Sequence, residues 1–313
     1  SVLLDGVFNH VSRRNRIVQD AQSAGPDSDA GRMVRWCAGR LDVFEGHSDL
    51  VALNHDNPAV REHVTRIMNY WCGRGVDGWR LDAAYSVNPE FWAAVLPSVR
   101  EKYPDVWIFG EVIHGDYASI VRASGMDSVT QYELWKGIWS SIESRNFFEL
   151  DHALGRHNEF SDAFTPMTFV GNHDVTRIAS RVGQDGAVLA TAILATIGGI
   201  PLIYYGDELA YRGVKEERFG GDDDIRPVFP ASPADLSNLG ADTLRAHQSL
   251  LGLRRRHPWL VDARTESLDL TNERYVYRTG VPGVEPLIVE LDVRDGCSVL
   301  IREAGQVVWS SGA

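Results

Sequence analysis

Three acidic side chains, each at or just after the end of an apolar run, are the groups in this sequence best placed to do chemistry. They are Asp82, Glu111 and Asp174. Groups at the carboxyl ends of parallel strands gather at one mouth of a sheet, so residues far apart in sequence can converge there. Two carboxyl groups flanking a glycosidic bond can hydrolyse it, because one attacks while ionised and the other donates a proton.

Arg80 and Asp82 close the run that begins at residue 76. Residues i and i+2 of a strand point to the same face, so the guanidinium and the carboxylate are expected to project together. In a catalytic role, Arg80 would keep Asp82 charged, as a nucleophile requires. The structural alternative is a buried ion pair that closes the strand and adds little stability, because desolvation offsets most of the attraction.

Glu111 has different neighbours in the sequence. Trp107, Ile108 and Phe109 precede it, and Val112 follows it directly. Apolar surroundings disfavour the charged form of a carboxyl group, so we expect Glu111 to carry a proton and act as the acid.

Short apolar strands that alternate with helices must position these groups. Asn57-Pro58 and Asn88-Pro89 are helix starts, with Asn as the cap and Pro at the first helical position. The alternation predicts parallel strands joined by crossover helices, and the uninterrupted apolar runs predict strands buried on both faces. Strands are expected near residues 2, 76, 106, 127, 167 and 200, and further helices over about 116–124, 187–197 and 243–256.

The sequence therefore predicts an α/β fold, a (β/α)8 TIM-type barrel followed by a C-terminal all-β domain. A closed barrel needs eight strands and six can be counted, so we expect the chain to be N-terminally incomplete by two strand–helix units. Residues 1–257 would form the partial barrel, with a long loop at 11–50. Short strands separated by turn residues would fill 258–313.

Composition restricts the class of partner. The formal charge is −12, from 31 Lys plus Arg against 43 Asp plus Glu. This balance argues against nucleic acid and anionic membranes and favours a neutral ligand. No apolar run reaches the length of a transmembrane helix. The 9 Trp, 10 Tyr and 11 Phe suit stacking on sugar rings, although ordinary core packing accounts for most of them.

Cys37, Cys72 and Cys297 are scattered and lack the spacing of metal ligands. We interpret them as reduced thiols, which predicts a cytoplasmic location. The acidic run at 222–224 is predicted to be a solvated loop and not a metal site.

Four short segments, in this order, resemble the regions typical of the α-amylase family of retaining glycoside hydrolases. They are DGVFNH (5–10), GWRLDAAY (78–85), GEVI (110–113) and FVGNHD (169–174). Each accompanies a predicted strand end, and the four together are far more specific than any one. The stretch from GEVIHGD to DSVTQY, with LNHDNPAV before it, is most similar to the cyclomaltodextrinase, neopullulanase and maltogenic amylase branch. The resemblance covers nearly the whole chain.

The resemblance implies a role for each carboxylate. Asp82 would be the nucleophile that forms a covalent glycosyl-enzyme, and Glu111 the general acid and then the base. Asp174 would bind the 2- and 3-hydroxyls of the sugar and stabilise the oxocarbenium-like state. The remaining residues that the resemblance assigns bind substrate or support the site: Arg80 would orient Asp82, His10 and His173 would contact the sugar, and Asp5, Asn9 and Arg177 would support them.

The resemblance also bears on cofactors and partners. Asn9 is a calcium ligand in some relatives, but residues 11–50 offer no cluster of oxygen ligands, so we predict no required metal and no cofactor. Family barrels begin with two strand–helix units before the DGVFNH segment. We therefore expect an N-terminal segment or a homo-oligomer to complete the barrel.

Three functions fit these observations. The first is hydrolysis of maltooligosaccharides or related α-glucosides. The second is transglycosylation or isomerisation, as in a glucanotransferase or a trehalose synthase, which shares the glycosyl-enzyme and differs in the acceptor. The third is a non-catalytic carbohydrate-binding remnant, against which the three intact carboxylates argue.

Overall fold

The computed structural model describes residues 1–218, 220–236 and 238–311, and the chain folds into two compact units. The first is Ser1–Thr130 and the second is Gln131–Ala313. Parallel strands lie at all six positions where the sequence predicts them, four in the first unit and two in the second. The α/β class is therefore confirmed.

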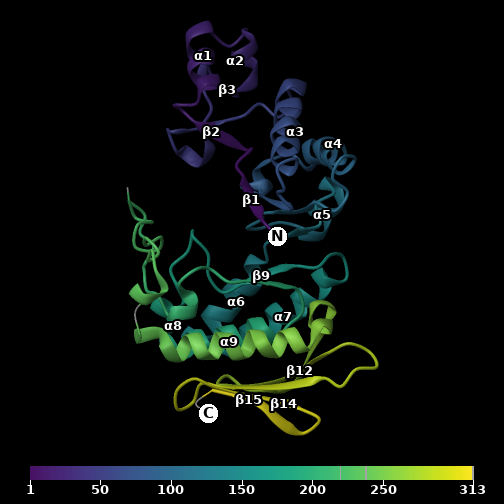
Figure 1. Ribbon diagram of the computed structural model, residues 1–313, viewed down its shortest axis with the longest axis vertical. Coiled ribbons are helices and arrows are strands. Elements are labelled where there is room, and N and C mark those ends of the chain that lie inside the picture. The colour runs from purple at the N-terminus through teal and green to yellow at the C-terminus, as the bar shows by residue number, and fades with distance from the viewer. Residues whose placement is uncertain (219, 237, 312–313) are drawn as a thin grey trace. The chain divides into compact units, whose positions relative to one another are not determined.

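A four-stranded parallel sheet is the centre of the first unit (Figure 1). The register pairs Asp5 with Arg80 and Leu81 with Gly110. Because the strands are parallel, the residues that follow them emerge at one edge of the sheet. In order across the sheet, the strands are β1 (Leu3–Gly6), β6 (Gly78–Leu81), β7 (Trp107–Gly110) and β8 (Ser128–Val129).

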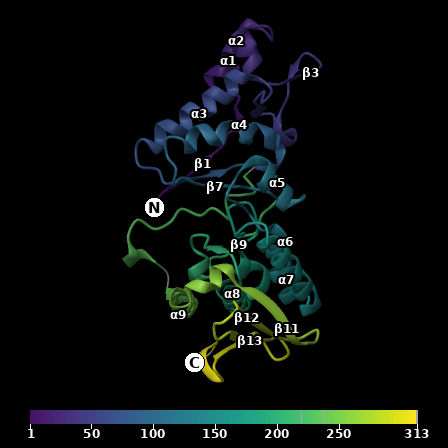
Figure 2. The same ribbon diagram turned by 90° about the vertical axis from the view of Figure 1, so that its right-hand side faces the viewer.

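Three helices connect these strands, and each begins where the sequence predicts. The side chains of Asn57, Asn88 and Asp116 accept hydrogen bonds from amides of the first turn, which satisfies donors that a helix start leaves unpaired. Figure 2 shows the first two helices side by side, and they are in contact. The helices are α3 (Pro58–Cys72), α4 (Pro89–Arg100) and α5 (Tyr117–Ser124).

Residues 11–50 contain regular structure, which corrects the prediction of a long loop. Asn15 and Ser28 cap two short helices, and the first of these buries only Val18 and Ala21. So few buried apolar residues leave no sustained hydrophobic period to detect. The elements are β2 (His10–Ser12), α1 (Arg16–Ala24), α2 (Asp29–Met33), β3 (Trp36–Cys37), β4 (Arg40–Leu41), a 3₁₀ turn at Phe44–Gly46 and β5 (Leu50–Ala52).

Helices and a five-stranded antiparallel sheet make up most of the second unit (Figure 1). The helices are α6 (Tyr132–Glu143), α7 (Phe147–Ser161), α8 (Ile178–Thr196) and α9 (Ala241–Arg256), with the parallel strands β9 (Met167–Phe169) and β10 (Ile200–Leu202). The sheet runs in the order β11 (Arg264–Leu270), β12 (Arg274–Gly280), β13 (Leu287–Asp292), β14 (Ser298–Glu303) and β15 (Gln306–Ser310). One hydrophobic cluster contains residues of these helices and of the sheet.

The predicted domain boundary after residue 257 falls inside this second unit. Tyr275, Val289 and Ile301 of the sheet lie in the same cluster as Leu250 of α9. The compact units divide the chain after Thr130 instead, so a separate domain at 258–313 stays a prediction. Strand β11 was not predicted from the sequence, because most of its residues are exposed and form no apolar run.

Helix α8 begins earlier than predicted, at Ile178. A φ of 74° at Gly183 interrupts its helical conformation, which hides the first part of the helix from a search for helical periodicity.

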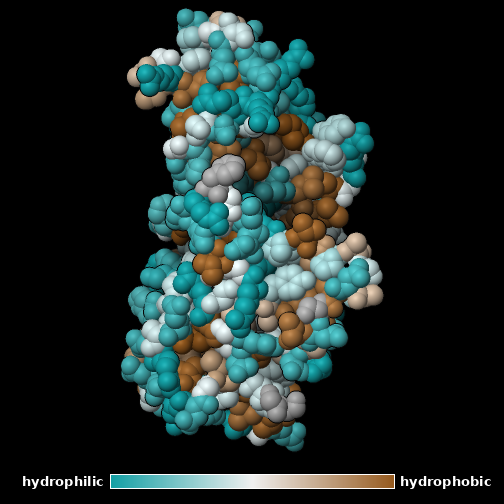
Figure 3. Space-filling model, turned by 90° about the vertical axis from the view of Figure 1, so that its left-hand side faces the viewer, coloured by the Kyte–Doolittle hydropathy of each residue, from teal (hydrophilic) through white to brown (hydrophobic). Residues whose placement is uncertain are grey.

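Among the described residues, no helix is both long and apolar enough to cross a lipid bilayer. The face in Figure 3 is mostly hydrophilic, and apolar side chains gather on it in several patches.

We expect Gly78→Ala to destabilise the first unit. A methyl group at residue 78 would lie 2.4 Å from the carbonyl oxygen of Trp107 on β7, so the two strands would have to move apart. A loss of about 1–3 kcal/mol in the free energy of unfolding should follow, measured by urea denaturation. Gly155→Ala is the control. It lies on an exposed part of α7, where the added methyl meets nothing within 4 Å, and it should gain up to about 1 kcal/mol. An unchanged Gly78→Ala midpoint would contradict the register of β6 and β7.

Candidate active site

One guanidinium, that of Arg80, contacts three carboxylates at the carboxyl end of the first-unit sheet. Its Nη1 donates to Oδ1 of Asp5 at 2.7 Å and to Oδ1 of Asp82 at 3.1 Å. Its Nη2 lies 2.9 Å from Oε1 of Glu111. The side chains of Arg80 and Glu111 are only 17% and 8% exposed, so these charges meet largely out of water. The structure thus joins Asp82 and Glu111 through one cation.

The parallel ladder explains how these side chains meet. Asp5 on β1 is the register partner of Arg80 on β6. Asp82 lies two residues beyond Arg80, on the same face, as predicted. The ladder between β6 and β7 continues for one more step, because the amide of Glu111 donates to the carbonyl of Leu81 at 2.8 Å. Glu111 is thereby fixed beside the end of β6.

Ala83 supplies a second donor to Glu111. Its φ of 44° lies in the left-handed region, which costs about 1–3 kcal/mol for a residue other than glycine. Its amide donates to Oε2 of Glu111 at 3.0 Å. Glu111 therefore has an ion-pair partner at Oε1 and a hydrogen-bond donor at Oε2, although its sequence neighbours are apolar. The apolar residues next to Glu111 in the sequence are therefore only part of its surroundings, because Arg80 and the Ala83 amide also contact its carboxyl group.

The environment of Asp82 also corrects an expectation. Burial raises the pKa of Asp82 to about 6; the charge of Arg80 opposes this rise, while Glu111 and Asp5 add to it. The attraction of one cation is thus outweighed by lost hydration and two like charges. Asp82 is still mostly ionised at pH 7, but it takes up a proton only slightly below neutrality.

His10 lies near the other oxygen of Asp82, with its Nε2 4.0 Å from Oδ2 of the carboxylate. Burial, followed by the charge of His47, lowers the pKa of His10, so the ring is neutral at pH 7. Nδ2 of Asn9 lies 3.2 Å from Nδ1 of His10, and the ring of Phe44 stacks on the imidazole with centroids 4.8 Å apart. The ring is therefore held on two sides, and sequence reasoning had not identified Phe44.

Asp174 belongs to the second unit, where two basic side chains hold it. Nη2 of Arg226 donates to its Oδ1 at 2.8 Å, and Nε2 of His173 lies 3.2 Å from its Oδ2. Arg226 also donates to the backbone carbonyl of His173 at 2.7 Å and pairs with Asp222 at 2.9 Å. The amide of Asp174 donates to Oδ1 of Asn172 at 2.9 Å, so the loop after β9 is fixed at several points.

Sequence reasoning missed Arg226 as a partner of Asp174. It follows the acidic run at 222–224, which was predicted to be only a solvated loop. Its pairing with Asp222 has a sequence signal, because an acidic residue stands four positions before a basic one. Its pairing with Asp174, 52 residues away, has none and becomes visible only in the fold.

Arg177 is fully buried and pairs with Asp207 at 3.0 Å. Its guanidinium lies over the ring of Tyr204, 4.2 Å from the centroid, and donates to the carbonyl of Tyr205 at 2.6 Å. Burial raises the pKa of Asp207 to about 7, against the attraction of Arg177. Arg177 therefore ties the segment after β10 to the start of α8.

Six of the nine predicted site residues are linked by these contacts in the first unit, and three belong to the second unit. The six are Asp5, Asn9, His10, Arg80, Asp82 and Glu111; the three are His173, Asp174 and Arg177. In the described part of the chain, no group of three or more His, Cys, Asp or Glu is arranged to hold a metal ion.

We expect Arg80→Met to destabilise the protein more at pH 8 than at pH 5. The substitution removes the cation shared by three carboxylates and raises the pKa of Asp82 further. When the pKa of Asp82 is higher in the folded than in the unfolded protein, ionised Asp82 destabilises the fold. The free energy of unfolding is therefore lower at pH 8, where Asp82 is ionised, and recovers at acidic pH, where Asp82 is protonated. Urea denaturation at pH 8 should show a loss of about 3 kcal/mol.

Arg16→Met is the matched control. Arg16 is 91% exposed on α1 and lies 3.6 Å from Asp20. Such a surface pair is worth less than about 1 kcal/mol, so both pH values should show little change. Equal losses at pH 5 and pH 8 for Arg80→Met would contradict the account based on charge.

Comparison with known proteins identifies the family of this chain. Residues 40–263 match the family model "Alpha amylase, catalytic domain". Alpha-amylase 3 of Dictyoglomus thermophilum is 34% identical over 188 residues, which are 55% of this chain and 37% of that protein. Maltogenic alpha-amylase of Bacillus acidopullulyticus is 30% identical over 283 residues, 83% of this chain and 46% of that protein. The chain spans less than half the length of these curated relatives.

The branch predicted from the sequence is represented among the matches, which include a cyclomaltodextrinase at 26% identity and neopullulanase 2 of Thermoactinomyces vulgaris at 28%. Among solved structures, the ligand-free cyclic alpha-maltosyl-(1→6)-maltose hydrolase of Arthrobacter globiformis has a TM-score of 0.80 at 22% identity, over 98% of this chain and 73% of that chain. This likeness shows the fold, that of a (β/α)8 barrel with a C-terminal β-sheet domain. Because the family match extends over more than half of the 313 residues, the chain belongs to the alpha-amylase catalytic domain family.

Proposed function

We propose that the protein is a retaining α-glucan hydrolase that acts on maltooligosaccharides or related α-glucosides through a covalent glycosyl-enzyme. The observation that carries this proposal is the single guanidinium of Arg80 between Asp82 and Glu111. It holds a nucleophile and an acid–base group in one largely buried cluster. The names of matched relatives, maltogenic alpha-amylase and cyclomaltodextrinase, support the substrate class.

In the first step, a carboxylate oxygen of Asp82 attacks the anomeric carbon, and the bond from that carbon to the glycosidic oxygen breaks. Glu111 gives its proton to the departing oxygen, which leaves as a neutral hydroxyl group. The products are an ester between Asp82 and the sugar, and an ionised Glu111. Arg80 holds the attacking carboxylate in position by its bond to Oδ1, which leaves Oδ2 to react.

In the second step, Glu111 takes a proton from water, and the water oxygen bonds to the anomeric carbon. Asp82 leaves as a carboxylate, and two inversions give net retention. Esterification of Asp82 has removed a negative charge beside Glu111. Glu111 gives up a proton in the first step and takes one from water in the second, so the same carboxyl group serves first as acid and then as base.

The other predicted site residues bind the sugar or hold neighbouring side chains in position. The neutral imidazole of His10 can exchange a hydrogen bond with a sugar hydroxyl, because it carries one donor and one acceptor. We assign His173 to sugar binding and Asp174 to the 2- and 3-hydroxyls. Asp5, Asn9 and Arg177 act through their neighbours, namely Arg80, His10 and Asp207.

This chemistry uses two carboxyl groups and water, so we assign no metal or cofactor to it. The neutral substrate suits a chain with a formal charge of −12. All three cysteines are free thiols, which supports a reducing compartment such as the cytoplasm.

Product analysis with maltotriose tests the proposed function. The first-formed product should have the α configuration, seen by proton NMR before mutarotation, because double displacement retains the anomer. Asp82→Asn should lower kcat by about 10³-fold or more, since it removes the nucleophile. A product of inverted configuration would contradict the mechanism. Products longer than maltotriose would favour a transglycosylase, and binding without products would favour a non-catalytic role.

The pH dependence of kcat/KM tests the two carboxyl roles. The rate should fall as pH drops through about 6, because protonation of Asp82 removes the ionised nucleophile. Glu111→Gln should abolish the basic limb and leave this acid limb in place. It should slow a maltoside with a nitrophenolate leaving group much less than maltotriose, since that leaving group needs no proton. Glu90→Gln, on the exposed surface of α4, is the matched control. An intact basic limb in Glu111→Gln would exclude Glu111 as the acid.

A further inference from the structure

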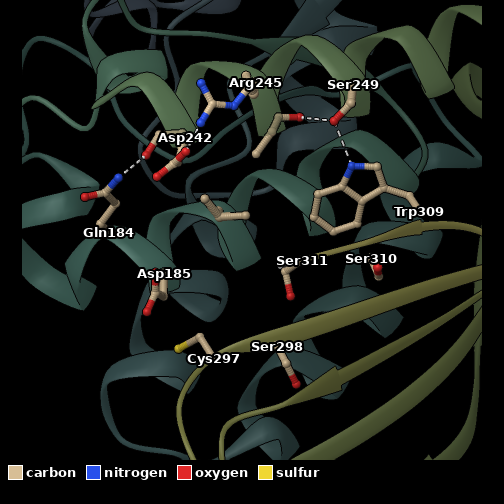
Figure 4. Close-up of a pocket in the computed structure, with 13 residues that line it drawn as sticks. Gln184, Asp185, Asp242, Arg245, Ser249, Cys297, Ser298, Trp309, Ser310 and Ser311 are labelled. Atoms are coloured by element: carbon tan, nitrogen blue, oxygen red, sulfur yellow. Dashed lines mark hydrogen bonds and ion pairs between the residues drawn. The ribbon is translucent and has the colours of Figure 1, made fainter. Parts of the chain in front are cut away.

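A pocket of about 610 Å³ lies in the second unit, among residues of α8, α9 and the end of the C-terminal sheet (Figure 4). Gln184 and Asp185 line it just after the break at Gly183, and Trp309 lines it from β15. Among the described residues that line this pocket, none belongs to the proposed active site. Its volume is within the range of sites for small molecules.

Trp309 gives the pocket a flat apolar wall. Its Nε1 donates to Oγ of Ser249 on α9 at 2.7 Å, which fixes the orientation of the ring (Figure 4). One part of the side chain packs against the core cluster, and the rest remains accessible to solvent. An aromatic ring held by its own N–H costs little conformational entropy when a ligand stacks on it.

The remaining lining is polar and slightly acidic. Gln184 is held by its hydrogen bond to the hydroxyl of Thr243 at 2.9 Å, and Asp242 pairs with Arg245. Asp185 adds an exposed carboxylate, and serine hydroxyls from β14 and β15 complete the wall (Figure 4). Two carboxylates against one guanidinium disfavour an anionic ligand. A wholly apolar ligand would leave these polar groups without partners.

We propose that this pocket is a second, non-catalytic binding site for one or two pyranose units of an α-glucan. A pyranose offers a face of C–H groups to the indole of Trp309. Its rim of hydroxyls matches the serines, Gln184 and the carboxylate of Asp185. The choice of an α-linked glucan rests on the proposed function; the choice of a sugar rests on the pocket itself.

Cys297 provides a reporter inside the pocket. It lines the pocket and is partly exposed, whereas Cys72 is buried and Cys37 is exposed elsewhere. In a Cys37→Ser, Asp82→Asn protein, which leaves the probe uncleaved, the rate of Cys297 alkylation by iodoacetamide is measured against maltoheptaose concentration. We expect a saturable slowing of at least about fivefold. This readout is independent of turnover, so a failure of the proposed hydrolase activity would leave it intact.

Matched variants assign the effect to the pocket. Trp309→Ala should weaken the apparent affinity for maltoheptaose about tenfold, and Trp309→Phe should retain most of it, because a ring is kept. Trp71→Ala, at a tryptophan that is 42% exposed on α3, should change nothing. Asp185→Asn, an exposed substitution that spares packing, should also weaken binding if Trp309→Ala fails to fold. The proposed binding site would be overturned if maltoheptaose does not slow alkylation of Cys297. Equal slowing in the Cys37→Ser, Asp82→Asn protein and in a folded pocket variant of it would also overturn the site. Equal protection by cellohexaose would overturn the α-glucan assignment.

Discussion

The arrangement at the edge of the first-unit sheet depends on the charge balance around Arg80. One cation faces Asp5, Asp82 and Glu111, two of which lie mostly out of water. Without that cation, burial and the charges of Glu111 and Asp5 would oppose ionisation of Asp82 still more strongly. With it, the pKa of Asp82 comes to about 6. Asp82 is then ionised at neutral pH, which is the state that the proposed nucleophile requires.

Backbone structure maintains this balance. Adjacent parallel strands supply Asp5 and Arg80 at the same level of the sheet, and the ladder continues to Glu111. Ala83 holds a left-handed conformation that directs its amide to Glu111. Strain of this kind persists only where surrounding structure fixes it, and it commonly lies at sites that must be organised before substrate arrives. The catalytic proposal therefore relies on backbone geometry as much as on residue identity.

The sequence could predict features that have local signals. Apolar runs located all six parallel strands, and the Asn-Pro pairs located the starts of α3 and α4. Features that depend on distant contacts were missed or wrongly predicted. The rise in the pKa of Asp82 is the sum of burial and several charges, and a neighbouring Arg80 suggested only the opposite effect. Exposed strand β11 and the short helices at 11–50 bury too little apolar surface to leave a periodic signal.

Asp82 in the first unit and Asp174 in the second each pair with an arginine, and the two pairs differ in their exposure to solvent. Arg80 is 17% exposed and Asp82 20%, whereas Arg226 is 42% exposed and Asp174 34%. Water and salt screen the second pair much more, so its net attraction is smaller. In the proposed mechanism Asp82 must keep one orientation through two chemical steps, and the contact with Arg80 fixes one of its oxygens. The proposed role of Asp174 requires it to exchange a protein partner for sugar hydroxyls, and its more exposed contact with Arg226 suits that role.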